Sequence, residues 1–208
     1  MPADDNHYRR EGDCVDINNF QSKNQLIDIE FSGFFENNLV VNEAKIYNAK
    51  LTKGISFSNF AKILSCVYKI KNNGDIRING ISIQEDKIAK RYIQNNTLIL
   101  KEGFIFLHPD LSLKDNIKIA SLLHCGFDLS NATLSSFLMK DFENVKVFYL
   151  TKEQKQMAIL SYCVACPSIL WVIDSCLINN LSEQNREIFE NTLKIRLKHG
   201  GAVIFVEQ

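Results

Sequence analysis

Residues 169–174, ILWVID, and residues 200–206, GGAVIFV, decide the fold class of this chain. Each contains five consecutive apolar residues, which is typical of a strand buried on both faces of a parallel sheet. Between them, Ser182 is a candidate N-cap for a helix from about Glu183 to Lys198, and Gly200-Gly201 suit its end. Strand, helix and strand with short links form a parallel βαβ unit, so both strands are predicted to lie in one sheet.

The segment from Met157 to Ile173 carries no charged residue, which raises the question of a membrane span. A spanning helix needs about 20 apolar residues, and this segment is slightly short. Pro167-Ser168 also interrupts it. The segment is therefore interpreted as a buried helix, a turn and a buried strand, with a transmembrane helix as the alternative.

The overall composition excludes some classes of function. The 208 residues carry 24 basic and 24 acidic side chains, so the net charge is zero and neither a nucleic-acid partner nor direct lipid binding is expected. Six cysteines without a secretory signal are typical of reduced thiols in the cytosol. Residues 1–25 are polar and aperiodic, and are predicted to be a loose leader before a single domain over 26–208.

Strand and helix patterns also precede the closing unit. LIDIEFSGFF (26–35) and LVVNEAKIYNA (39–49) flank a turn signal, which predicts an antiparallel N-terminal β portion. LTKGISFS (51–58) is a polar loop that leads into a helical pattern, and GDIRINGISI (74–83) is predicted to be a strand bent at a glycine. Residues 108–150 are predicted to form a small helical subdomain. The chain is thus expected to be an α/β protein with a mainly parallel sheet and flanking helices.

These segments resemble, in order and spacing, the ATP-binding subunits of ABC transporters. FIFLHPDLSLKDNI (104–117) resembles the glutamine loop of that family, LTKEQKQMAIL (150–160) its signature segment, and ILWVID its Walker B strand. The resemblance covers roughly residues 27–208. Because little sequence follows the last strand, the chain is most similar to the ATP-binding subunit of the cytochrome c maturation haem exporter. The resemblance implies a P-loop NTPase fold of the ABC ATPase type, bound ATP and Mg²⁺, a dimer, and integral membrane permease subunits as partners.

The same resemblance places LTKGISFS on the phosphate-binding loop, where glycine amides and a lysine hold phosphates. The candidate nucleotide-binding residues there are Gly54, Ser56, Phe57 and Ser58, and Ser58 is also a candidate Mg²⁺ ligand. Phe57 stands where the lysine is expected, which removes a charge-assisted contact worth about 1.5–3 kcal/mol. The alternative is a serine-capped turn into a helix that binds nothing. The register is fixed to within one residue.

Four further positions follow from the resemblance. Asp174 corresponds to the Walker B aspartate and His108 to the loop glutamine, which makes both candidate metal-site residues. Ser175 and Gln208 stand at the catalytic glutamate and the switch histidine. Both are expected to be inactive, because serine is no base near neutral pH and glutamine takes no proton. The alternatives are a carboxylate that caps the next turn, for Asp174, and an exposed side chain before a proline turn, for His108.

The signature segment keeps Thr151 and Gln154 as candidate nucleotide-binding residues. Lys152 and Glu153 add bulk where the family's backbone approaches a partner's nucleotide. The alternative is a capping box at the start of a helix. A separate CxxC pattern, Cys163 to Cys166, lacks a second pair of ligands and is interpreted as buried structural thiols rather than a zinc site.

Two hypotheses about function follow. In the first, the chain is an ATP-binding subunit of an ABC transporter with weak or no ATPase activity, because the lysine, glutamate and histidine are replaced together. In the second, it is a non-catalytic pseudo-ATPase scaffold that only binds its membrane partner. Both predict a cytoplasmic protein held peripherally at the membrane by a protein partner, through residues 108–150.

Overall fold

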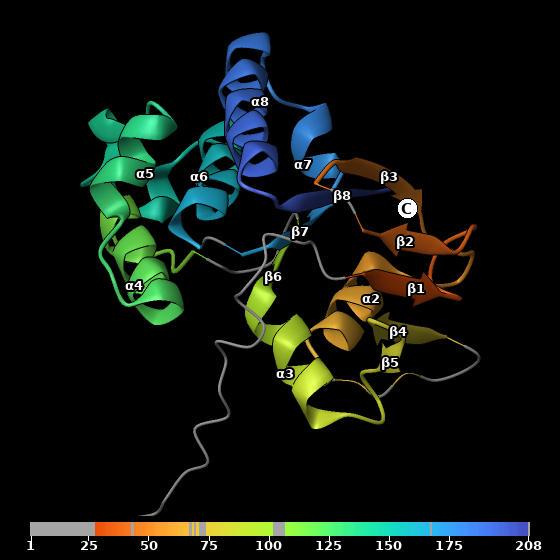
Figure 1. The fold of residues 1–208 in the computed structure, drawn as a ribbon. Coiled ribbons are helices and arrows are strands. Elements are labelled where there is room, and N and C mark those ends of the chain that lie inside the picture. The colour runs from red at the N-terminus through yellow and green to blue at the C-terminus, as the bar shows by residue number, and fades with distance from the viewer. Residues whose placement is uncertain are drawn as a thin grey trace, which may run out of the picture.

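A four-stranded parallel sheet forms the centre of the protein (Figure 1). The computed structural model describes residues 28–42, 44–66, 68, 70, 74–101, 107–166 and 168–207. The strand order is β3-β8-β7-β6, and every neighbouring pair is parallel. The strands are β3 (Ile46–Lys50), β8 (Ala202–Glu207), β7 (Leu170–Asp174) and β6 (Thr97–Leu100). The predicted α/β class is confirmed, and the two closing strands do lie side by side in one sheet.

A second, antiparallel sheet comes from the N-terminal half. Its order is β2-β1-β4-β5, with β1 paired to both β2 and β4. The strands are β1 (Ile29–Ser32), β2 (Leu39–Val41), β4 (Asp75–Ile78) and β5 (Ile81–Ser82). Helices α2 (Phe57–Leu64) and α3 (Lys87–Asn96) lie beside it in Figure 1. The predicted antiparallel N-terminal portion is therefore present.

The stretch GDIRINGISI forms a hairpin, so the prediction of one bent strand was wrong. Arg77 pairs with Ser82 and Ile78 with Ile81 in antiparallel register. The turn consists of Asn79 and Gly80, both with positive φ, 50° and 79°. Asn-Gly tolerates this conformation well, and such two-residue turns match the twist of the strands they join.

Most of the helical structure lies between β6 and β7, on the left of Figure 1. The Ser112 hydroxyl oxygen accepts from the Asp115 amide at 3.1 Å and caps the helix that begins at Leu113. Ser130 instead lies inside its helix, and the Asp128 carboxylate accepts from its amide at 3.0 Å. The elements are α4 (Leu113–Cys125), α5 (Ser130–Ser136), the 3-10 turns η1 (Lys140–Phe142) and η2 (Val147–Tyr149), and α6 (Lys152–Ala165). The division into a helical subdomain over 108–150 stays a prediction.

The end of the chain follows the predicted pattern closely. After β7 come the short helix α7 (Cys176–Asn179) and the long helix α8 (Glu183–Lys198), whose bounds match those predicted. Gly200 follows α8 with a φ of 80°, which a glycine adopts without strain. Ser182 stands at the N-cap position, but its hydroxyl makes no capping hydrogen bond.

The parallel sheet is buried on both faces because alternate residues of each strand enter different clusters. Trp171 and Ile173 of β7 pack with α6 and α8, whereas Leu170 and Val172 pack with α2 and the antiparallel sheet. The charge-free stretch thus divides into α6, a turn and β7, as predicted. Among the described residues, no helix is both long and apolar enough to cross a membrane. Cys163 and Cys166 are free and buried, which confirms the structural-thiol interpretation.

Candidate functional site

The candidate site lies at the carboxyl edge of the parallel sheet. In this kind of open α/β sheet, ligands bind outside the carboxyl ends of the strands. The loop after β3 leads directly into α2, and β8 aligns that loop with β7, because Lys50 pairs with Glu207 and Asp174 with Val206. The sheet therefore brings the phosphate-loop position and the Walker B position to the same edge.

The loop after β3 is a tight turn followed by a serine cap. The Ile55 amide donates to the Thr52 carbonyl at 3.0 Å, and Gly54 has a φ of 92°, which a side chain would strain. Ser56 is the N-cap of α2, and its hydroxyl oxygen accepts from the Asn59 amide at 3.2 Å. The serine-capped turn that formed the alternative is thus present. The presence of this cap does not decide whether the loop binds a nucleotide.

Phe57 points into the protein, and Ser58 faces a lysine from another strand. The Phe57 side chain is 0% exposed and belongs to the cluster that covers one face of the sheet. The next residue, Ser58, is half-buried, and its hydroxyl oxygen accepts a short hydrogen bond from the ammonium of Lys101. Lys101 directly follows β6. The ammonium group that contacts Ser58 therefore belongs to the residue after β6 and not to the loop before α2.

Asp174 ends β7 in an enclosed position. It is 2% exposed, and its Oδ1 accepts from the Cys176 amide at 3.0 Å, which is the turn-capping role given as the alternative. The Ser175 amide donates to the Val206 carbonyl at 3.0 Å, and Ser175 is the residue immediately before α7. Gln208 lies outside the described residues. Whether Asp174 or Ser175 acts on a nucleotide stays a prediction.

His108 lies in the turn that leads into α4. Its ring Nδ1 accepts from the Asp110 amide at 3.3 Å, and its own amide donates to the Asn116 side chain at 2.6 Å. The residue is exposed and precedes Pro109, as the structural alternative expected. These contacts join His108 to the start of α4.

The signature position is a complete capping box. The Thr151 hydroxyl oxygen accepts from the Gln154 amide at 3.2 Å, and the Gln154 side-chain oxygen accepts from the Thr151 amide at 2.8 Å. Glu153 lies against α8, where its Oε1 accepts from the Ser182 amide at 2.9 Å and from the Asn185 side chain at 2.7 Å. Hydrogen bonding from Ser182 and Asn185 lowers the pKa of the Glu153 carboxyl. The structural alternative for this segment is therefore present.

The two candidate Mg²⁺ ligands at this edge already take part in hydrogen bonds within the protein. Mg²⁺ takes oxygen ligands in a near-octahedral arrangement. The Ser58 oxygen is engaged by an ammonium group, and Asp174 already accepts from a backbone amide. In the described part of the chain, no group of three or more His, Cys, Asp and Glu side chains could hold a metal ion.

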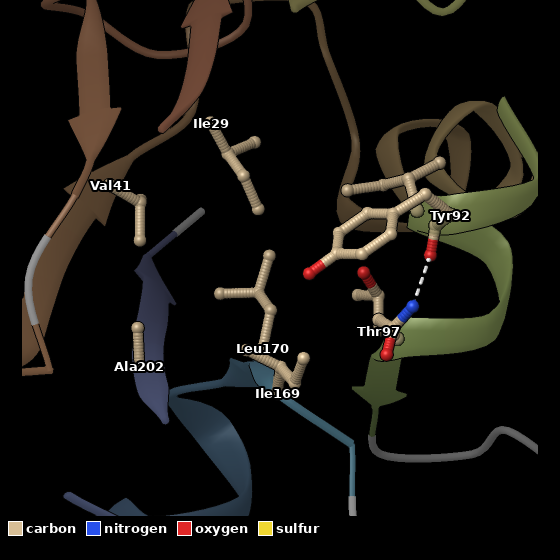
Figure 2. Close-up of a pocket in the computed structure, with 9 residues that line it drawn as sticks. Ile29, Val41, Tyr92, Thr97, Ile169, Leu170 and Ala202 are labelled. Atoms are coloured by element: carbon tan, nitrogen blue, oxygen red, sulfur yellow. Dashed lines mark hydrogen bonds between the residues drawn. The ribbon is translucent and has the colours of Figure 1, made fainter. Parts of the chain in front are cut away.

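A separate small cavity lies at the opposite end of the strands (Figure 2). Its lining includes the first residues of three parallel strands, Thr97, Leu170 and Ala202. Figure 2 shows Tyr92 and Thr97 on one side of it and Ile29 and Val41 on the other. The cavity holds about 10 Å³, which is about the room one water needs. It is too small for a nucleotide.

Sequence reasoning missed Lys101. It drew no prediction from TLIL (97–100), which forms the strand that pairs with β7 and that Lys101 follows. The signal was available, since TLIL is a short apolar run followed by a charged residue. Residues 102–106 lie outside the described residues.

The arrangement of the sheets and helices defines the class of fold. It is the P-loop NTPase fold in the form of ABC transporter ATP-binding domains. A putative ABC transporter ATP-binding protein from Pyrococcus furiosus superposes with a TM-score of 0.64 at 17% identity, covering 87% of this chain and 91% of that one. The ATP-binding subunit of another ABC transporter gives a TM-score of 0.67 at 14% identity, covering 86% and 79%.

Curated proteins of similar sequence are of one kind. The chain is similar to the cytochrome c biogenesis ATP-binding export protein CcmA of Rickettsia conorii, with 22% identity over 86% of this chain and 89% of the relative. The CcmA protein of Rickettsia felis is 23% identical over 85% of this chain and 86% of its own length. No protein-family model matches the chain.

Proposed function

We propose that this chain is the ATP-binding subunit of an ABC transporter that resembles the haem exporter of cytochrome c biogenesis, and that it has weak or no ATPase activity. One observation carries the proposal. The loop into α2 and Asp174 meet at the carboxyl edge of one parallel sheet, as a nucleotide site of this fold requires. The similarity to CcmA proteins extends over most of the chain and supports the same conclusion.

Nucleotide binding is supported by the groups that surround this edge. The first turn of α2 presents backbone amides and the positive end of the helix dipole, which favour phosphate. Lys101 adds a full positive charge beside Ser58. A triphosphate bound there would lie between the α2 N-terminus and β6.

Weak hydrolysis is supported by the groups that are missing. Phosphoryl transfer depends on charge stabilisation and on a residue that orients the attacking water. Phe57 is buried in the core and offers no charge, and Ser175 carries no carboxylate after Asp174. Glu153 accepts a hydrogen bond from Ser182 at the start of α8, and the side chains of Thr151 and Gln154 form the capping box at the start of α6. Closure over a second subunit's nucleotide would have to break these contacts.

A membrane-protein partner is supported by apolar side chains on the helical region. Seven large apolar residues of α4, of η2 and of the loops that follow α4 and α5 are exposed. Leu123 is 85% exposed and Tyr149 is 73% exposed. The set is Ile119, Leu122, Leu123, Phe127, Leu138, Phe148 and Tyr149. We infer that permease subunits dock here, with the chain on the cytoplasmic face of the membrane.

The second candidate function is a pseudo-ATPase scaffold that binds only its membrane partner. The burial of Phe57 favours it, because the side chain at the position of the family's lysine is then an apolar ring that cannot contact phosphate. The two candidates agree on docking and on the fold. They differ in whether ATP binds at all.

Titration of the purified chain with ATP, followed by isothermal calorimetry, separates the two. The proposed function expects saturable binding with a Kd below about 1 mM, which corresponds to roughly 4 kcal/mol. Absence of heat at millimolar ATP, in a protein that still binds its permease subunit, would favour the scaffold.

A further inference from the structure

Lys101 contacts Ser58, the residue whose hydroxyl oxygen a divalent cation at this site would need as a ligand. The ammonium of Lys101 donates to the Ser58 hydroxyl oxygen, and the two residues are 43 positions apart in the sequence. Lys101 comes from the loop after β6, the edge strand beside β7. The contact therefore arises only because β6 and α2 meet at the carboxyl edge of the sheet.

The lysine and a metal ion compete for the same oxygen. A lysine ammonium has three donors and no acceptor, so its contact with Ser58 uses a lone pair of the hydroxyl oxygen. A magnesium ion would need that oxygen at about 2.1 Å. At that distance the ion and the ammonium would lie within a few ångströms of each other with like charges. Only one of the two can occupy the position.

Other lysines lie near this edge, and Lys53 is exposed in the loop itself. Lys50, at the end of β3, forms an ion pair with Glu36 at 2.9 Å. The side chain at position 57 is an apolar ring in the core. Of these lysines, Lys101 is the one whose ammonium group contacts the first turn of α2, through Ser58.

We propose that Lys101 takes the place of Mg²⁺ at the phosphate site, so that this chain binds nucleoside triphosphates without a divalent cation. The proposal rests on the proposed function, since it assumes that ATP binds at this edge. In such a site, the ammonium group of Lys101 contacts the phosphates of ATP in place of a metal ion. Binding is then independent of free Mg²⁺.

The test measures ATP binding to the full chain by calorimetry, in excess Mg²⁺ and in excess EDTA. Wild type is expected to keep its Kd within about threefold, less than 1 kcal/mol, when Mg²⁺ is removed. Lys101→Met keeps the aliphatic stem and removes the charge. In EDTA it is expected to weaken binding by roughly 10–150-fold, the factor that corresponds to one charge-assisted hydrogen bond. Adding Mg²⁺ should restore part of that loss, because Ser58 is then available to the ion.

Lys87→Met is the matched control, because Lys87 is exposed at the start of α3, away from this edge. It should bind as wild type does in both buffers. Thermal melting of each variant verifies that it is folded. Wild-type binding that falls tenfold or more in EDTA, or Lys101→Met that binds as wild type in EDTA, would overturn this proposal while leaving ATP binding intact. No binding by wild type in either buffer would overturn the proposed function as well.

Discussion

Thr151 and Gln154 hydrogen-bond each other's backbone amides at the start of α6, with distances of 3.2 Å and 2.8 Å. Each side chain satisfies an amide that would otherwise lack a partner at the helix end. The same two residues stand, by resemblance, at the signature sequence of ABC transporter ATP-binding subunits. They therefore stabilise a helix N-terminus whether or not they contact a nucleotide.

Removing the Thr151 hydroxyl should destabilise the protein. Thr151→Ala is expected to lower the free energy of unfolding by about 1 kcal/mol, the usual contribution of an N-cap side chain. Thr151→Ser keeps the hydroxyl oxygen and should lose far less. Urea denaturation followed by circular dichroism measures both. Equal losses for alanine and serine would show that the methyl group, and not the cap, stabilises this site.

Restoring a lysine in the loop should damage the fold without restoring activity. Phe57 is fully buried, so Phe57→Lys is expected to cost at least the about 3–5 kcal/mol of removing a buried phenylalanine. Phe57→Leu, the apolar control, should cost roughly 1–2 kcal/mol. Urea denaturation compares the free energies of unfolding, and calorimetry compares ATP binding. A stable Phe57→Lys variant with tighter ATP binding would mean that the loop can turn this side chain outward.

Phosphate release should remain near background. The purified chain, alone or with its membrane partner, is expected to hydrolyse ATP far below about one turnover per second, since each lost 1.4 kcal/mol of barrier stabilisation is tenfold in rate. Ser175→Glu alone should not raise the rate, because the loop still lacks its lysine. Steady turnover of about one per second or faster, abolished by Asp174→Asn, would contradict both the register and the assigned losses.

Thiol labelling should distinguish the cysteines by burial. Burial raises the pKa of the Cys163 thiol well above its usual value and that of Cys166 to about 12, whereas Cys176 is exposed. Iodoacetamide at pH 8 should label Cys176 at least about tenfold faster than Cys163, since the thiolate is the reactive form. Peptide mass spectrometry measures the labelling rate at each cysteine, and Cys176→Ser should remove the rapidly labelled peptide. Native labelling of Cys163 at the rate of Cys176 would show that α6 opens readily.

The contact between Glu153 and α8 should weaken in acid. The pKa of Glu153 is lowered in the folded protein, so its stabilising effect is present above the ordinary value of 4.5 and is lost as pH falls through the folded pKa. Melting temperatures of wild type and Glu153→Gln should therefore differ at pH 7 and converge below pH 4. The glutamine can still accept from the Ser182 amide. A difference that is independent of pH would assign the effect to packing.

Local patterns were enough to predict several elements. Five-residue apolar runs and a capped helical stretch predicted β7, α8 and β8, because a strand buried on both faces needs unbroken apolar sequence. The capping box at Thr151 was also readable, since its partners are three residues apart. The hairpin at Asn79-Gly80 was readable but was missed, although Asn-Gly is a strong signal for such a turn.

The candidate site was only partly predictable. Gly54 and Ser56 lie in the loop before α2 and Ser58 in its first turn, close to where the resemblance placed them, and Asp174 ends β7. The direction of the Phe57 side chain could not be read from its neighbours, because it depends on how α2 packs against the sheet. The pairing of Thr97–Leu100 with β7 was likewise not predicted, since which apolar run pairs with β7 depends on residues far away in the sequence.

By itself, the sequence determined the α/β class and the closing βαβ unit, and its resemblance to ABC transporter ATP-binding subunits predicts that a lysine, a glutamate and a histidine are replaced. These properties follow from residue identity and from patterns that span a few residues. Only the tertiary structure decided that Phe57 is buried, that Glu153 contacts α8 and that Lys101 faces Ser58. Each of these contacts joins segments that the chain brings together by burying both faces of one parallel sheet, and no local pattern specifies which segments will meet.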